Sequence, residues 1–288
     1  MKYRFVEVRQ QEYPVRRMCA LLGISRSGYY AWKKRKPSQR AKRNEELVEE
    51  IRKIHKKSRA IYGSPRVHAE MKKQGYGVNQ KTVARLMRQE GLVGVRKNRK
   101  VRTTDSNHRF PVAPNLLNRD FTAEQPNQKW AADITYIPTE EGWLYLAGVL
   151  DLFSRKIVGW AMSSQIDANL VEQALRMAFY LREPGIGLLH HSDRGSQYAS
   201  YQIHDLLASK QIQISMSRRA DCYDNSVMES FFSTLKNEWV HHRKYKTRAQ
   251  ARTDIFSYIE GFYNTVRLHS TLGYCSPNEF EALYHNSP

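Results

Sequence analysis

The sequence lacks the features that mark a secreted, disulfide-rich or membrane protein. Its three cysteines, Cys19, Cys222 and Cys275, are far apart and show no C-x-x-C spacing, which argues against a disulfide framework and a structural zinc site. No run of about 18 or more apolar residues could cross a membrane, and the N-terminus lacks the apolar stretch of a signal peptide. We therefore expect an intracellular, cytoplasmic protein without a membrane partner.

Acidic residues are scarce in the first two fifths of the chain. Residues 1–120 contain 31 Lys and Arg against 10 Asp and Glu, a net charge of +21. Residues 121–288 contain 16 Lys and Arg against 18 Asp and Glu, a net charge of −2. A positive field that is confined to one part of a chain attracts a polyanion there. We expect the first part to bind nucleic acid and the second part, with its apolar segments, to carry a different activity.

Residues 1–43 contain the pattern of a helix-turn-helix. A short apolar helix around Met18 meets Gly23, and Ser25 can cap a second helix. This arrangement suits a recognition helix in a major groove, although any small helical hairpin also needs a glycine turn and a cap. The candidates for DNA contact here are Arg26, Lys33 and Lys34.

Residues 44–95 predict a second helical region that resembles a helix-turn-helix domain. Apolar periodicity predicts helices at 45–57, 65–74 and 80–90. The basic residues of the last helix either contact phosphates, which we expect, or form a solvated face, which is the alternative. They are Lys81, Arg85 and Arg88.

Residues 96–120 separate the helical regions from the rest of the chain. They lack sustained periodicity and contain two prolines, so we expect a basic, partly extended linker. Further candidates for DNA contact in this linker are Lys97, Arg99 and Lys100.

Residues 121–288 change to a pattern of short strands. Three sequential strands with short connections, at 130–137, 143–150 and 156–162, predict an antiparallel meander. Two more strands are expected at 186–193 and 212–217, with helices at 168–182, at 199–209 and after 225. The order predicts an α/β domain with a mixed five-stranded sheet flanked by helices.

Three carboxylates stand out in this domain. Asp133 lies inside the first strand, where Asp is depleted and costly to bury unpaired, unless the strand is a solvent-facing edge. Asp193 ends the strand 186–193, where α/β sheets place functional side chains. Glu229 follows after 35 intervening residues and shares a polar helix stripe with Lys236. A capping box with Ser226 would explain Glu229 without catalysis.

The three carboxylates together predict a metal site. They would repel one another unless a divalent cation neutralised them, and hard oxygen ligands favour Mg²⁺ or Mn²⁺. Two such ions about 4 Å apart support in-line displacement at a phosphodiester. Glu238 is a rival third ligand, but it lies two helical turns from Glu229.

Two neighbouring histidines do not change this expectation. His190 and His191 point to opposite faces of a strand, so they cannot readily share a zinc ion. One of these histidines is expected to pack in the core and the other to lie near the carboxylates. We assign no catalytic role to either histidine or to Cys222.

The chain resembles insertion-sequence transposases of the integrase type in WAADITYI, DLFSRKIVGW, HSDRGSQY, DNSVMESFFSTLKNE and the ending YNTVRLHSTLGYCSP. The match covers nearly the whole chain and looks like the second-reading-frame product of elements that make their enzyme by frameshifting. It implies a ribonuclease-H-like fold of the DDE superfamily, with Asp133, Asp193 and Glu229 as metal ligands. It also implies that Lys236 contacts DNA near the transferred end.

The resemblance also implies partners. They are the terminal repeats of the element, target DNA, a further copy of the protein on DNA, and a first-reading-frame protein or a fusion with it. The protein would be bacterial and associated with the nucleoid when bound to DNA. The His/His/Cys/Cys zinc module of retroviral integrases has no counterpart in this sequence, so zinc is not expected.

The resulting hypothesis is a transposase that uses Mg²⁺, with two ions, to cut DNA 3′ ends and join their hydroxyls to target DNA. One alternative is a metal-dependent nuclease on the same fold, with water as its nucleophile. Another is a DNA-binding regulator whose C-terminal domain has lost catalysis.

Overall fold

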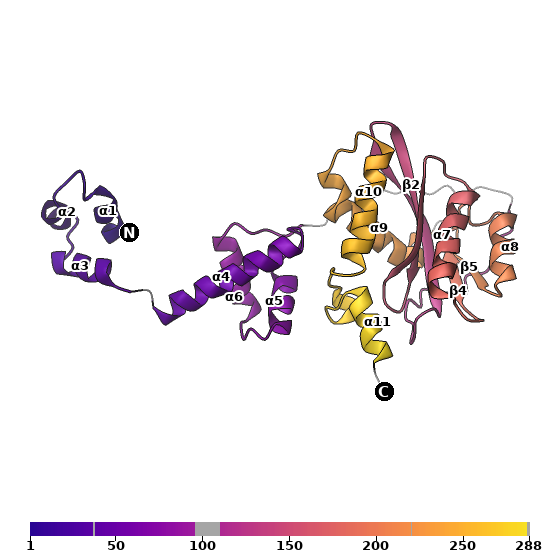
Figure 1. The fold of residues 1–288 in the computed structure, drawn as a ribbon, viewed down its shortest axis with the longest axis horizontal. Helices are drawn as coiled ribbons and strands as arrows, with labels where there is room; N and C mark the ends of the chain where they lie inside the picture. The colour runs from indigo at the N-terminus through magenta and orange to yellow at the C-terminus, as the bar shows by residue number, and fades with distance from the viewer. Residues whose placement is uncertain (37, 96–109, 220, 287–288) are drawn as a thin grey trace. The chain divides into compact units, whose positions relative to one another are not determined.

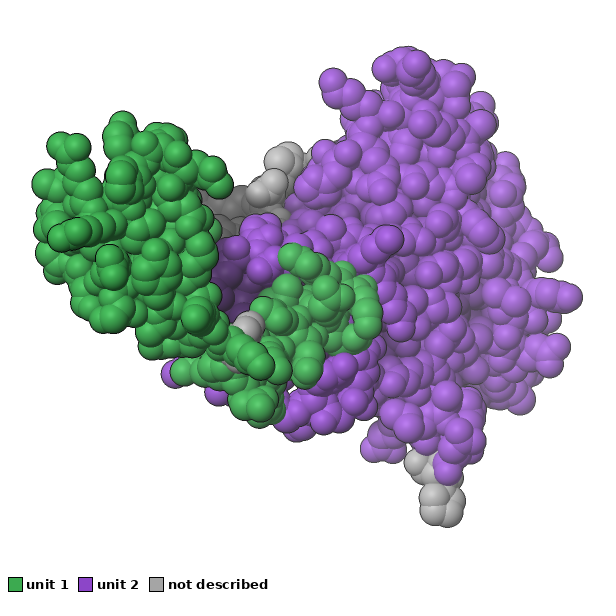
Figure 2. All heavy atoms as spheres, turned by 60° about the vertical axis from the view of Figure 1, so that its left-hand side comes forward, with its two compact units in different colours: residues 1–53 green, residues 54–288 purple. Residues whose placement is uncertain are grey.

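The computed structural model describes residues 1–36, 38–95, 110–219 and 221–286 (Figure 1). The chain divides into two compact units, Met1–Lys53 and Ile54–Pro288 (Figure 2). The candidate DNA contacts Lys97, Arg99 and Lys100 lie outside the described residues. No helix in the described part of the chain has the length and apolar character needed to cross a bilayer.

The first unit begins with three short helices, α1 (Lys2–Arg9), α2 (Val15–Leu21) and α3 (Arg26–Lys34). The predicted hairpin of α2 and α3 is confirmed: Gly23 has φ of 61° in the turn, and the Ser25 hydroxyl accepts a hydrogen bond of 3.1 Å from the Gly28 N–H. Helix α1 was not expected, because its first residues carry no side-chain cap. Its Val6 is fully buried in the small core around Tyr29.

Three further helices follow, α4 (Gln39–Lys57), α5 (Ser64–Lys73) and α6 (Gln80–Gln89). Helix α4 begins earlier than the expected 45 and contains the boundary between the two units. Helix α6 begins as predicted, because the Asn79 side chain accepts a hydrogen bond of 2.8 Å from the Thr82 N–H.

The second unit contains the expected sheet, whose strands are β1 (Lys129–Thr139), β2 (Gly142–Asp151), β3 (Ile157–Ser163), β4 (Leu189–Ser192) and β5 (Gln213–Met216). The strand order is β3-β2-β1-β4-β5. Strands β1, β2 and β3 form the predicted antiparallel meander, and β4 and β5 run parallel to β1. The prediction of a mixed five-stranded sheet is confirmed.

Helices cover both faces of this sheet (Figure 1). Helices α7 (Ala168–Arg182) and α8 (Tyr201–Ser209) share one core with Trp130 and Ala132 of β1. Helices α9 (Ser226–Glu238) and α10 (Arg248–Tyr258) lie on the opposite face. The remaining elements are η1 (Cys222–Asn225), η2 (Val240–His242), η3 (Ile259–Tyr263), η4 (Ser270–Leu272) and α11 (Pro277–His285).

The described half of the expected linker, residues 110–120, contains no helix or strand. It is nevertheless held against β5, because the Ser215 hydroxyl accepts hydrogen bonds of 2.9 and 3.1 Å from the N–H groups of Leu116 and Leu117. The chain therefore enters the sheet domain along a fixed path before β1 begins.

Candidate active site

Asp133 lies in the central strand of the sheet. It pairs with Gly148 of β2, and a Cβ atom added at Gly148 would lie 3.3 Å from Met228 of α9, so this face of β1 looks towards α9. The Asp133 carboxylate accepts a hydrogen bond of 2.8 Å from the Ile134 N–H. Because β1 is flanked by β2 and β4, the alternative of an edge residue is wrong.

Asp193 lies beside Asp133. Strands β1 and β4 are parallel, and Ala132 is in register with Ser192, so the next residue along each strand is an aspartate. The Asp193 carboxylate accepts a hydrogen bond of 2.9 Å from the Gly195 N–H in the turn that follows. The two carboxylates thus meet at the same end of two adjacent strands.

Glu229 approaches from α9. The capping box with Ser226 is wrong: Asn225 is the N-cap, Ser226 already lies in the helix, and no side chain caps it. Apolar residues spaced by four, three and four positions in the sequence predict a buried stripe on this helix, and the structure confirms it: Met228, Phe232, Leu235 and the C-cap Trp239 are all buried. Glu229 is half-buried, next to this stripe.

The electrostatics of Asp133 show that the three carboxylates lie in one region. Burial raises the pKa of Asp133 well above its ordinary value, and the negative charges of Asp193 and Glu229 raise it further. Over the described residues, however, no group of three or more His, Cys, Asp or Glu side chains has the spacing of a finished metal site. Repulsion between the negatively charged carboxylates opposes a closer approach of these three groups to one another.

The donor set fits a hard divalent cation. All three side chains offer carboxylate oxygens, which Mg²⁺ and Mn²⁺ prefer. The accumulated negative charge that raises the pKa of Asp133 is the charge that such a cation would neutralise.

Lys236 lies two turns further along α9. Its Nζ atom is 4.8 Å from the centre of the Tyr136 ring of β1. Burial lowers the pKa of this ammonium group, and the nearby charge of Asp133 opposes that shift. An ammonium group therefore stands at the rim of the carboxylate region.

The rival ligand Glu238 is occupied elsewhere. Its carboxylate accepts two hydrogen bonds of 2.7 Å from the guanidinium of Arg267, one of 3.1 Å from the Tyr258 hydroxyl and one of 3.4 Å from Arg66 of α5. Although burial alone raises the pKa of Glu238, the bonds from Arg267 bring it below its ordinary value. Glu238 is thus part of a buried ion-pair network.

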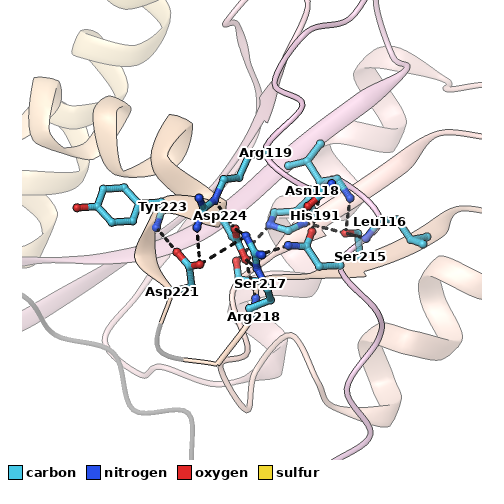
Figure 3. Close-up of polar contacts among 12 residues, drawn as sticks. Leu116, Asn118, Arg119, His191, Ser215, Ser217, Arg218, Asp221, Tyr223 and Asp224 are labelled. Carbon is cyan, nitrogen blue, oxygen red and sulfur yellow. Dashed lines mark hydrogen bonds and ion pairs between the residues drawn. The ribbon is translucent and has the colours of Figure 1, made fainter.

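The two histidines occupy different surroundings. The ring nitrogens of His191 lie 2.8 and 3.1 Å from the hydroxyls of Ser215 and Ser217 (Figure 3). His190 packs against Tyr198, and burial lowers its pKa to about 3. The two rings therefore have different partners, as expected for consecutive residues of a strand.

Asp224, which lies just before α9, was not among the residues singled out from the sequence. Its side chain is fully buried and accepts hydrogen bonds of 2.8 to 3.0 Å from Arg218, Arg119 and Asn115 (Figure 3). The bonds from Arg218 hold the pKa of Asp224 well below its usual range. Only its place in the segment DNSVMES, directly before the helix, could have drawn attention to it.

The candidate DNA contacts lie on two helices. On α3, Arg26, Lys33 and Lys34 are exposed. On α6, Lys81 and Arg88 are exposed, whereas Arg85 is half-buried and donates a hydrogen bond of 2.9 Å to Gln89.

Comparison with known proteins agrees with this arrangement. Two models described as an integrase core domain match residues 123–222 and 210–277, and an HTH-like domain matches residues 42–100. The chain is 46% identical to an insertion element IS600 31 kDa protein of Shigella sonnei, over 93% of this chain and 98% of that protein. It is 41% identical to the transposase InsF for insertion sequence IS3A of Escherichia coli, over 98% of each.

The match to InsF runs from the helical region through the integrase core and leaves almost no part of either chain uncovered. The sheet order, the covering helices and the preceding helical region are those that the sequence predicts for a ribonuclease-H-like core behind a DNA-binding region. The chain therefore belongs to the IS3 family of insertion-sequence transposases.

Proposed function

We propose that Asp133, Asp193 and Glu229 bind two Mg²⁺ or Mn²⁺ ions, and that this DDE-type transposase cuts DNA 3′ ends there and joins them to target DNA. The observation that carries the proposal is the register of β1 and β4, which brings Asp133 and Asp193 side by side on the face that looks towards α9 and its Glu229. Two of these carboxylates stand on adjacent strands and the third on a helix, so the backbone itself supports the donor set.

The cations would activate the attacking hydroxyl or water and stabilise the leaving oxygen. The protein's own part is to hold the carboxylates and to bind the DNA. Lys236 would hold a phosphate of the transferred end, because its ammonium group stands at the rim of the carboxylate region.

DNA binding beyond the site falls to the basic helices. We propose that α3 and α6 contact DNA through Arg26, Lys33, Lys34, Lys81, Arg85 and Arg88, with Lys97, Arg99 and Lys100 following them along the chain. We also propose self-association on DNA, a first-reading-frame partner or fusion, and association with the nucleoid in the bound state.

The test is a strand-transfer assay with end DNA that bears a free 3′-hydroxyl, supercoiled plasmid and Mg²⁺ or Mn²⁺, using the protein alone and fused to its upstream frame. Glu229→Gln is expected to lose joining and to keep its DNA affinity, because the basic field lies elsewhere. The exposed Glu140→Gln serves as matched control and is expected to join normally. Normal joining by Glu229→Gln would remove Glu229 from the site.

Other products would point to the alternatives. Nicked plasmid without joined ends favours a nuclease, and tight binding without any cleavage favours a regulator. In the same assay Lys236→Ala is expected to join fewer ends while still binding Mg²⁺; full activity would remove Lys236 from the site.

The proposed contact between α6 and DNA can be tested separately. Replacing both Lys81 and Arg88 with Ala should lower the affinity for end DNA and reduce the slope of log affinity against log salt by about 1 for each phosphate that is no longer neutralised. Binding is measured by fluorescence anisotropy between low and moderate salt. The exposed Lys210→Ala, directly after α8 in the sheet domain, is the control. An unchanged slope would mean that these residues only solvate α6.

A further inference from the structure

Asn225 stands at the start of α9 but does not cap it. Asn is among the favoured N-cap residues, because its side chain can accept a hydrogen bond from the first free N–H groups of a helix. In this protein no side-chain bond of that kind forms at Asn225. The Asn225 amide instead donates a hydrogen bond of 3.0 Å to the backbone carbonyl of Ala132 in β1.

This bond joins the elements that carry two of the proposed metal ligands. Ala132 directly precedes Asp133, and Asn225 lies one helical turn before Glu229. Asn225 is buried, with 5% of its surface exposed, so water does not compete strongly for the bond. A single side chain therefore bridges α9 and the central strand beside the carboxylates.

The orientation of the Asn225 amide carries a cost. Its Oδ1 atom is buried and has no hydrogen-bond partner among the residues that the structure describes. An unpaired buried acceptor is unfavourable and calls for an explanation. Turning the amide over would place two oxygens against each other at Ala132, so the bond to β1 decides the orientation.

The neighbouring residue fixes the same turn from the other side. Asp224 is held by Arg218 within its own loop and by Arg119 and Asn115 from the segment that enters the sheet domain (Figure 3). Asp224 and Asn225 thus anchor the beginning of α9 in two directions, one towards residues 115–119 and one towards β1.

We infer that Asn225 is a positioning residue: it fixes the start of α9 against β1 and so limits how far Glu229 must move to bind the same divalent cations as Asp133, with Asp224 holding the turn before the helix. The inference rests on the proposed function. The proposed ligands are the three carboxylates, and the part assigned to Asn225 is the bond from its amide nitrogen to Ala132.

The test uses Asn225→Ser in the full chain. Serine can cap α9 as well as asparagine can, but its side chain is too short to reach Ala132. The variant is expected to need about tenfold more Mg²⁺ for half-maximal strand transfer, as when the outer support of a metal ligand is removed. The Mg²⁺ concentration that gives half of the Mg²⁺-induced rise in melting temperature should increase by a similar factor, without any DNA present.

The matched control is Asn237→Ser on the same helix. Asn237 is also buried, but its amide donates within α9 to the Ser233 carbonyl at 2.7 Å. This variant is expected to keep the Mg²⁺ requirement of the natural protein, even if its melting temperature falls. An equal shift in both variants would mean general loosening of α9 and would overturn the inference, as would an unchanged requirement in Asn225→Ser.

A second variant covers the case in which Asn225→Ser does not fold. Asp224→Asn leaves Arg119 and Arg218 with about half of each side chain exposed, so both can be hydrated when the carboxylate charge is removed. It should raise the Mg²⁺ requirement in the same direction, and an unchanged value would contradict the positioning role. Glu229→Gln is assayed together with both variants. Joining by Glu229→Gln would overturn the proposed function. If Glu229→Gln is inactive but Asn225→Ser has a normal Mg²⁺ response, only the inference about Asn225 is overturned.

Discussion

Replacing Asp133 with Asn is expected to abolish strand transfer and, at the same time, to stabilise the metal-free protein. Loss of one ligand from a two-ion site should lower the joining rate by about 10³-fold, which corresponds to about 4 kcal/mol of transition-state stabilisation. The stability gain follows because Asp133 is a partly buried charge beside two others. Joining assays and thermal unfolding without metal measure the two effects.

The pH dependence of this gain has a definite sign. The folded protein raises the pKa of Asp133 above the value of about 3.9 in an unfolded chain, so protonated Asp133 favours folding. That stability is present below about pH 4 and is lost as the pH rises through the raised pKa. Asp133→Asn should therefore melt at a higher temperature than the natural protein at pH 7, with little difference near pH 4.

Two comparisons make the Asp133 result specific. Mg²⁺ should raise the melting temperature of the natural protein more than that of Asp133→Asn, because ligand binding stabilises the folded state. The exposed Asp205→Asn on α8 should change neither activity nor stability. An inactive Asp133→Asn that is also less stable would show that Asp133 supports the fold and would count against the metal assignment.

Glu238→Ala is expected to show the largest loss of stability. It leaves the Arg267 guanidinium, with 6% of its side chain exposed, without its carboxylate partner. Removing one member of a buried ion pair costs about 3–5 kcal/mol. For a domain of this size the melting temperature should fall by about 10 °C.

The control for Glu238 is an exposed ion pair in the same unit. Glu172 pairs with Arg176, whose side chain is 64% exposed, so Glu172→Ala should cost no more than about 1 kcal/mol. Scanning calorimetry at neutral pH compares the variants. If Glu238→Ala melts like the natural protein but loses its response to Mg²⁺, Glu238 would replace Glu229 as the third ligand.

Local patterns in the sequence predicted the elements that carry the site. The alternation of side chains along a strand predicts that Ala132 and Asp133 lie on opposite faces, and the structure packs Ala132 in the α7–α8 core while Asp133 faces α9. The four-and-three spacing of apolar residues correctly gave the buried stripe of α9. These patterns depend on residues within a few positions of one another, which is why they can be read without the fold.

Interactions between distant residues were beyond the sequence patterns. Arg119 meets Asp224 and Arg66 meets Glu238 across more than a hundred positions, and no local pattern indicates either pair. The Ser226 capping box was wrong for a related reason. The bond from Asn225 to Ala132 fixes where α9 begins, and that bond belongs to the tertiary structure.

Side-chain hydrogen bonds hold helix α9 at both of its ends. Asn225 bonds the first turn of α9 to β1. At the other end, Glu238 accepts hydrogen bonds from Arg267 and from Arg66, which belongs to α5 of the HTH-like region. Glu229 and Lys236 lie between these two points on the same helix. A shift of α9 along its own axis would therefore break a contact at one end or the other, so Glu229 and Lys236 keep a constant position relative to β1 and Arg267.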